Sequence, residues 1–269
     1  MNERLEREAH EIGSILCFGV DPILEKISPK EKIKKEKVGL KIEEFFSPII
    51  EKLIEEKQIA SIKPNYAYFA QYGFEGLFAL KKIIDQNKNK VNIILDGKRG
   101  DIGTTAQAYA KEMYEFWNVD SVTVAPYMGS DSILPFLREE KTVYVLCKTS
   151  NKSASEFQDL KISGKHLFEI VAKEARKLGA GLVVGATSDS ILKINKICKD
   201  EVPFLIPGIG SQGGDLEIVM KAIGKRPFIH RINSSSGISY AFEKSGENTV
   251  SSALKQAQKL NKEIANFIH

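Results

Sequence analysis

The feature that most constrains the fold is the regular alternation of short apolar runs with longer amphipathic segments. Most of the runs are apolar throughout, as is typical of parallel strands covered on both faces. The longer segments have the residue spacing of amphipathic helices. The eight runs are 15–20, 59–63, 91–95, 121–125, 142–147, 181–185, 203–206 and 227–232. The clearest helical patterns are 38–56, 103–117, 164–178, 213–223 and 247–268.

Eight strand–helix units in a chain of 269 residues predict one α/β domain spanning 1–269, a closed (β/α)₈ barrel. Hydrophobic residues make up 42% of the chain, which is enough for a large core. A doubly wound open sheet is the alternative architecture. It would place ligands at a single crevice, however, and polar residues follow nearly every run.

These polar residues predict where the site lies. In a (β/α)₈ barrel the carboxyl ends of the strands form the mouth that holds the active site. The polar or turn residues at those ends are Asp21, Lys63, Asp96, Lys98, Lys148, Ser150, Gly208 and Asn233.

Charge and composition argue against several classes of protein. The chain has 39 Lys and Arg against 35 Asp and Glu, a net charge of +4, and the two signs are intermixed, which does not favour a nucleic-acid surface. No stretch is apolar enough to span a membrane, and the charged N-terminus lacks the pattern of a secretory signal. Three cysteines and four histidines without metal-ligand spacing predict no metal site. A cytoplasmic location fits this cysteine content best.

The most informative segment is 95–105, LDGKRGDIGTT. Because strand side chains alternate, Asp96 and Lys98 are expected to point together into the mouth, and Asp101 follows three residues later. Carboxylates on both sides favour the protonated form of a lysine. We therefore expect Lys98 to be an acid or a fixed cation, which disfavours an imine-forming aldolase.

Two other interpretations of this segment stay open. It could be an exposed charged turn whose salt bridges contribute little to stability or function. Its Arg99-Gly100-Asp101 sequence also occurs in adhesion proteins, so the loop could belong to a recognition module.

A second segment, 206–215, contains Gly-x-Gly-x-x-Gly after a predicted strand. A dinucleotide site would need an acidic residue about 20 positions later, where this chain has His230 to Asn233. The glycines still fit backbone binding of an anion at a helix N-terminus, or simply a tight turn. Since the last two loops of such barrels commonly bind phosphate, the pattern favours a phosphorylated substrate. The serines at 234–236 could complete this cradle or cap a helix, and the long polar loop 149–164 is a candidate lid.

Three segments together resemble one known family. They are DGKRGDIGTTA at 96–106, SIKPN at 61–65 and PGIGSQGG at 207–214, and the similarity extends from Asp21 to about Tyr240. They resemble the longer branch of the orotidine 5′-phosphate decarboxylases. That resemblance implies a (β/α)₈ barrel dimer that converts orotidine 5′-monophosphate (OMP) to uridine 5′-monophosphate (UMP) and carbon dioxide without a cofactor or metal. The alternatives are a Mg²⁺-dependent sugar-phosphate decarboxylase or aldolase of the same superfamily, and a non-catalytic phosphate-binding relative.

The resemblance also implies roles for single residues. Lys63, Asp96, Lys98 and Asp101 form a charged array, with Lys98 as proton donor and Asp101 supplied by the partner subunit. The expected substrate-binding residues are Asp21 and Asn65 at the ribose, Ile102 and Thr105 from the partner, Thr149 and Ser150 at the pyrimidine, and Pro207, Gly208, Gly210, Gln212, Ser235 and Ser236 toward the phosphate.

One position departs from the family pattern. Where the family usually has a phosphate-binding arginine, this chain has Ser236. Arg231, five residues earlier, could supply the missing charge, or the backbone at 234–237 could bind the anion without one.

Overall fold

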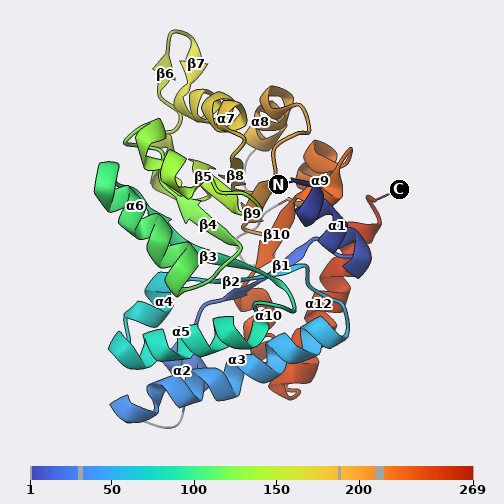
Figure 1. The fold of residues 1–269 in the computed structure, drawn as a ribbon. Coiled ribbons are helices and arrows are strands. Elements are labelled where there is room, and N and C mark those ends of the chain that lie inside the picture. The colour runs from blue at the N-terminus through green and yellow to red at the C-terminus, as the bar shows by residue number, and fades with distance from the viewer. Residues whose placement is uncertain (1, 30–32, 187–188, 210–214, 269) are drawn as a thin grey trace.

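The computed structural model describes residues 2–29, 33–186, 189–209 and 215–268. Within these residues, eight parallel strands close into a barrel in the order β1-β10-β9-β8-β5-β4-β3-β2 (Figure 1). This confirms the predicted fold class. The strands are β1 (Leu16–Val20), β2 (Ser61–Pro64), β3 (Asn92–Arg99), β4 (Ser121–Val124), β5 (Thr142–Lys148), β8 (Gly181–Val184), β9 (Phe204–Pro207) and β10 (Arg231–Ser234).

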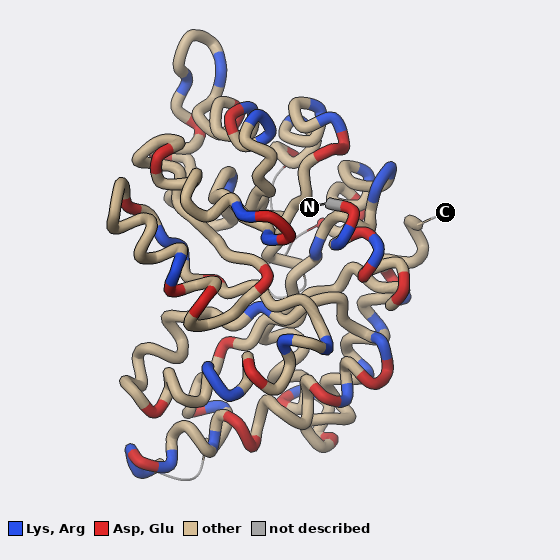
Figure 2. Tube along the Cα trace, viewed as in Figure 1, with Lys and Arg blue, Asp and Glu red and all other residues tan. Residues whose placement is uncertain are grey.

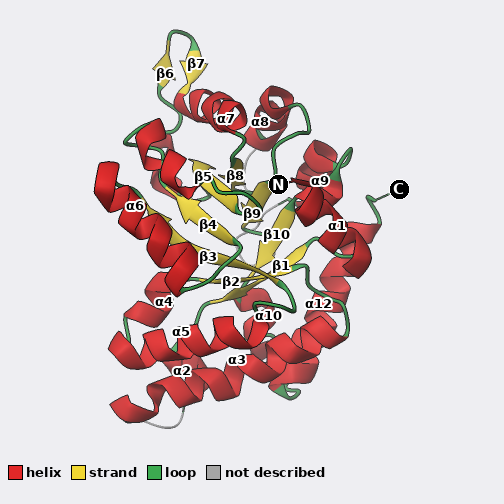
Figure 3. Ribbon diagram, viewed as in Figure 1, coloured by secondary structure: helices red, strands yellow, loops and turns green. Residues whose placement is uncertain are grey.

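Helices cover the outside of the barrel (Figure 3). The longest, α3 and α12, pack against each other, and α3 also packs against α5. A π-helical turn, Glu112–Phe116, extends α6. The helices are α1 (Asn2–Ile12), α2 (Leu24–Ile27), α3 (Val38–Glu55), α4 (Tyr66–Ala70), α5 (Gly73–Asn87), α6 (Gly103–Lys111), α7 (Leu167–Leu178), α8 (Ser190–Cys198), α9 (Leu216–Ile223), α10 (Ser236–Ser239), α11 (Phe242–Ser245) and α12 (Thr249–Ala265).

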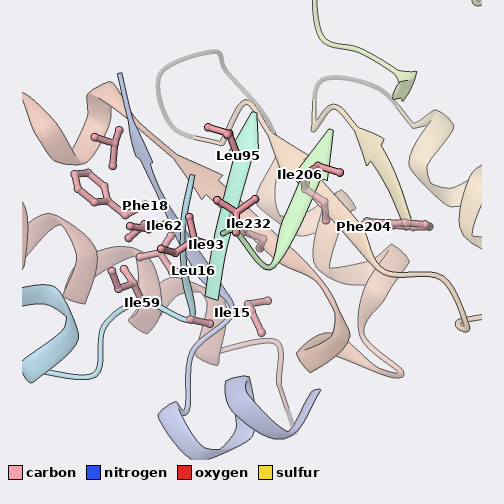
Figure 4. Close-up of a cluster of buried hydrophobic side chains, with 14 of the residues drawn as sticks. Ile15, Leu16, Phe18, Ile59, Ile62, Ile93, Leu95, Phe204, Ile206 and Ile232 are labelled. Carbon is pink, nitrogen blue, oxygen red and sulfur yellow. The ribbon is translucent and has the colours of Figure 1, made fainter. Parts of the chain in front are cut away.

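Alternation along the strands divides the core into two regions. Outward-facing side chains such as Phe18, Ile62 and Ile93 are completely buried between the barrel and its helices (Figure 4). Burial of each such side chain contributes about 1.5–3 kcal/mol, so this shell supplies most of the hydrophobic stabilisation. A smaller group that includes Cys17 and Tyr144 fills the barrel interior.

Among the predicted boundaries that were wrong, two have a clear physical reason. The run 227–232 is a 3-10 turn, Pro227–Ile229, followed by β10, which begins only at Arg231. Proline lacks an N–H and is favoured in the first turn of a helix, so the apolar run there does not start as a strand. The helix predicted from 164 begins at Leu167, because Ser163 and Gly164 have positive φ and turn the hairpin of β6 (Lys161–Ile162) and β7 (Lys165–His166).

The surface has the mixed charge expected from the sequence. Positive and negative residues are interspersed along the outer helices (Figure 2). In the parts of the chain that the structure describes, no helix has both the length and the apolar composition needed to cross a membrane. Cys17, Cys147 and Cys198 are buried and form no disulfide.

Candidate active site

A cavity of about 390 Å³ opens at the carboxyl ends of the strands. This is the position that the barrel fold predicts for an active site. The predicted site residues that line it are Asp21, Lys63, Asn65, Asp96, Lys98, Thr149, Ser150, Pro207, Gly208, Ser235 and Ser236.

A carboxylate held between two ammonium groups lies in this cavity. Asp96, at the end of the regular part of β3, is only 9% exposed. Its Oδ2 lies 2.9 Å from Lys63 Nζ, and its Oδ1 lies 2.6 Å from Lys98 Nζ. The Thr123 hydroxyl donates a further hydrogen bond to Oδ1 at 2.8 Å. Three of the four residues of the predicted array are therefore in direct contact.

Burial and charge act in opposite directions on this pair. Burial acts to lower the pKa of Lys63, but the carboxylates of Asp96 and Asp21 outweigh it and raise that pKa above its ordinary 10.5. Burial likewise acts to raise the pKa of Asp96, but Lys63 and Lys98 outweigh it and hold that pKa well below its ordinary 3.8. Both groups are therefore charged at neutral pH.

The backbone at Lys98 is unusual. Strand β3 has a register irregularity between Leu95 and Arg99, and Lys98 has a φ of 45°, a conformation that non-glycine residues rarely adopt. The Lys98 N–H donates to the Thr123 hydroxyl at 3.0 Å, which holds this conformation. The Lys98 side chain is 49% exposed, so its ammonium group can meet a ligand while it remains bonded to Asp96.

Two buried oxygens of the cavity wall have no hydrogen-bond partner among the described residues. They are Oδ1 of Asp21 and Oδ1 of Asn233. Burying a polar atom without a partner is unfavourable, so both positions favour a ligand that carries hydroxyl or N–H groups. The Asn65 side chain accepts from the Ala67 N–H at 3.3 Å and caps α4, and the backbone of Asn65 forms a β-bridge with that of Asp96.

Three predicted site residues lie away from the cavity of their own chain. Asp101 accepts a hydrogen bond from the Ile102 N–H, and Ile102 is 52% exposed. Thr105, in the first turn of α6, is exposed as well. Gly210 and Gln212 lie outside the described residues.

The hypothesis that Arg231 binds phosphate is wrong on geometry. Arg231 is completely buried at the amino end of β10, and it donates to the carbonyl oxygens of Phe228, His230 and Leu5. Leu5 belongs to α1, which packs on the turn before β10 at the opposite end of the barrel from the cavity. Ser236 does line the cavity.

Thr123 was not predicted from the sequence as a site residue, and Asn233 was predicted at a strand end without a role. Both lie at inward-facing positions of strands, and Thr123 stands two residues after the buried Ser121. This two-residue alternation of polar groups in a buried strand was the available signal. Tyr68 and Tyr240 also line the cavity, but they come from helices and the loops beside them, where no such pattern exists.

Comparison with known proteins now identifies the family. Residues 16–247 match the orotidine 5′-phosphate decarboxylase / HUMPS family. The chain belongs to this family. An orotidine 5′-phosphate decarboxylase of Herpetosiphon aurantiacus is 39% identical over 252 residues, 91% of this chain and 90% of that protein. One from Cupriavidus metallidurans is 40% identical over 248 residues, 89% of each chain.

Solved structures of an OMP decarboxylase and of a UMP synthase have the same fold. The structure of Leishmania donovani OMP decarboxylase superposes with a TM-score of 0.80 at 32% identity, covering 99% of this chain and 98% of that one. The structure of Leishmania donovani UMP synthase gives a TM-score of 0.82 at 34% identity, and covers 98% of this chain but 55% of that longer one. The family predicted from the three sequence segments is confirmed.

Proposed function

We propose that this chain decarboxylates OMP to UMP and carbon dioxide, the final step of de novo pyrimidine synthesis. The observation that carries this proposal is the Lys63–Asp96–Lys98 array in the cavity at the barrel mouth. Family membership and the named relatives support the same reaction.

The chemistry requires a charge to be stabilised at C6 of the pyrimidine. When the bond from C6 to the carboxylate carbon breaks, carbon dioxide leaves and the electron pair stays on C6. A fixed ammonium group at Lys98 stabilises this carbanion without reorganisation and then donates a proton to C6. Lys98 then recovers its proton from solvent, which completes the cycle. The proposed reaction uses no cofactor or metal. Asp96 holds Lys98 in place through the 2.6 Å ion pair. In the proposed complex Asp96 would lie beside the substrate carboxylate.

The remaining polar groups of the cavity would bind the rest of the nucleotide. We assign Asp21 and Asn65 to the ribose hydroxyls, because the Asp21 carboxylate has a buried oxygen without a partner. Thr149 and Ser150 would contact the pyrimidine. The phosphate end belongs to Pro207, Gly208, Gly210, Gln212, Ser235 and Ser236. Binding energy from this distant end can order the charged array and so lower the barrier.

The complete site also requires a second copy of the chain. Asp101, Ile102 and Thr105 lie outside the cavity of their own chain, and we assign them to the partner's site in a homodimer. The loop that carries them approaches the loop after β4, because Gly100 lies against Ala125. The latter loop exposes Tyr127 and Met128, which are 88% and 54% exposed, and the former exposes Ile102. A second copy would remove this apolar surface from water. We place the enzyme in the cytoplasm, whose reducing conditions suit its three free cysteines.

The test is the loss of OMP absorbance with the purified chain in the presence of a chelator. We expect turnover in chelator and its loss in Lys98→Ala, by at least about 10²–10³-fold, the usual effect of removing one group that stabilises the transition state. A Mg²⁺-dependent relative would lose activity in chelator. A non-catalytic relative would bind UMP but turn nothing over. Near-normal turnover in folded Lys98→Ala would contradict the proposal.

A further inference from the structure

The wall of the cavity formed by Thr149 and Ser150 is held by a side chain that does not itself line the cavity. Gln158 lies nine residues further along the chain. Its Oε1 accepts a hydrogen bond from the Thr149 N–H at 2.9 Å, and its Nε2 donates to the Thr149 hydroxyl at 2.8 Å. One amide group therefore binds both the backbone and the side chain of Thr149.

The donors and acceptors of Thr149 allow only one orientation of the Gln158 side-chain amide. The Thr149 hydroxyl donates to Asn151 Oδ1 at 2.6 Å, so toward Gln158 it can only accept. The partner on that side must be the NH₂ group of the amide, which leaves the amide oxygen for the Thr149 N–H. A carboxylate or an alkyl side chain at position 158 cannot provide this pair of contacts.

Gln158 is itself fixed to the barrel. Its N–H donates to the Ala154 carbonyl oxygen at 2.8 Å, and its carbonyl oxygen accepts from the N–H of Phe168 in α7 at 3.1 Å. Its neighbour Asp159 forms a 2.7 Å ion pair with Lys148, the last residue of β5, which is only 8% exposed. The backbone at Gln158 and Asp159 is therefore fixed to α7 and β5, and this fixes the point from which the Gln158 side chain extends to Thr149.

On its other side, the wall formed by Thr149 and Ser150 packs against Gly185, the residue that follows β8. The Gly185 N–H donates to the Lys148 carbonyl oxygen at 2.7 Å. A Cβ at Gly185 would lie 3.0 Å from the Ser150 nitrogen and 3.1 Å from its Cβ. Thr149 and Ser150 are therefore confined between Gln158 and a glycine, and a small shift of either would move them relative to the cavity.

We infer that Gln158 is a positioning residue, which sets the place of Thr149 and Ser150 against the base of the bound nucleotide. The inference rests on the proposed function for the contact of this wall with the pyrimidine. Because the contact exists with both the substrate and the transition state, its loss weakens binding more than it slows the chemical step.

The experiment compares Gln158→Ala and Gln158→Glu with the unchanged chain and with a control, Ser155→Ala. Ser155 lies in the same loop and is exposed, and among the described residues its hydroxyl hydrogen-bonds only to the Lys152 carbonyl oxygen, at 3.4 Å. We expect KM for OMP to rise roughly tenfold in Gln158→Ala, with kcat within about threefold of the unchanged chain, since two hydrogen bonds that order the wall are lost. Gln158→Glu keeps an acceptor for the Thr149 N–H and should show a smaller rise. Ser155→Ala should match the unchanged chain.

Other outcomes would separate the two proposals. A KM for both Gln158 variants within twofold of the unchanged chain would overturn the positioning role, as would a lower kcat at unchanged KM, which indicates only a smaller folded fraction. Calorimetric binding of UMP should weaken in the same order as KM rises. Failure of the unchanged chain to decarboxylate OMP would contradict the proposed function instead, and UMP binding by the same variants would still test Gln158.

Discussion

Asp96 is the residue on which the charges of the site depend, because its two carboxylate oxygens contact the ammonium groups of Lys63 and Lys98. Asp96→Asn leaves Lys63, which is 5% exposed, without the carboxylate that it contacts directly, and only the more distant Asp21 remains as a counter-charge. Breaking a buried ion pair in this way costs about 3–5 kcal/mol. We expect a loss of that size in the free energy of unfolding, measured by urea denaturation at pH 7. The free energy of unfolding should fall much less in Lys98→Ala, because the Lys98 side chain is half exposed. Equal decreases in the two variants would contradict this account.

The same pair predicts a pH dependence of stability. The pKa of Asp96 is held below its ordinary 3.8, so its contribution is complete above that value and is lost as the pH falls further. The pKa of Lys63 is raised above 10.5, so its contribution is complete below that value and is lost as the pH rises further. Urea unfolding from pH 3 to 11 should therefore show both losses in the unchanged chain. In Asp96→Asn the acidic loss should be smaller, and an identical acid limb in the two proteins would refute the assignment.

Replacing Arg231 should lower the stability of the fold without changing the binding of substrate. Arg231 is buried, and its guanidinium satisfies three carbonyl oxygens at the end of the barrel away from the cavity. Arg231→Met should destabilise the fold by roughly 2–5 kcal/mol, because buried carbonyl groups lose their donors. KM for OMP should stay within about twofold of the unchanged chain, because Arg231 lies away from the cavity. If Arg231 instead bound the phosphate, losing that charge-assisted contact would cost roughly 1.5–3 kcal/mol of binding and KM would rise strongly. A strongly raised KM in a folded variant would restore the phosphate role.

At the scale of elements, an error in one strand boundary explains the error at Arg231. The apolar run 227–232 placed this residue next to the carboxyl end of the eighth strand, near the mouth. Because Pro227–Ile229 forms a 3-10 turn, β10 starts at Arg231, and the residue lies at the opposite end. Alternation along a strand predicts which side chains point inward. The depth of those side chains in the barrel depends on the residue at which the strand begins, and an apolar run in the sequence does not define that residue well.

Close packing between neighbouring strands gives a prediction for β1. A Cβ at Gly19 would lie 1.8 Å from the Oγ and 2.7 Å from the Cβ of Ser235, which lines the cavity beyond β10. Gly19→Ala must displace Ser235, so we expect a higher KM for OMP and a loss of about 1–3 kcal/mol in the free energy of unfolding, as is usual for overpacking. The double variant Gly19→Ala/Ser235→Gly removes the colliding side chain and should regain most of the stability. Equal stability of the single and double variants would show that the strands separate instead.

At the scale of the whole molecule, the barrel and the position of its cavity could be predicted because they follow from repeated local patterns. Most strand ends contributed one or two polar or turn residues, and closure of the barrel brought most of these residues to one cavity. Lys98 lies within β3 and lines the cavity, whereas Asp101, Ile102 and Thr105 follow that strand within six residues and do not line it. Strand-end position alone therefore does not predict which chain's site a residue serves, because that depends on the contact between two molecules.

Subunit exchange tests that contact directly. If Asp101 acts in the partner's site, Asp101→Ala and Lys98→Ala should each be inactive alone, because every site in either homodimer lacks one group. In a mixed dimer, one site combines the intact Lys98 of the first chain with the intact Asp101 of the second, and the other site lacks both. Mixing the two inactive proteins should then restore up to about half of the activity of an unchanged dimer per mixed dimer. A mixture of Asp101→Ala with Asp101→Ala/Lys98→Ala is the matched control and should stay inactive, since no pairing of those chains completes a site. No recovery after exchange has been verified by mass labelling would mean that Asp101 serves its own chain.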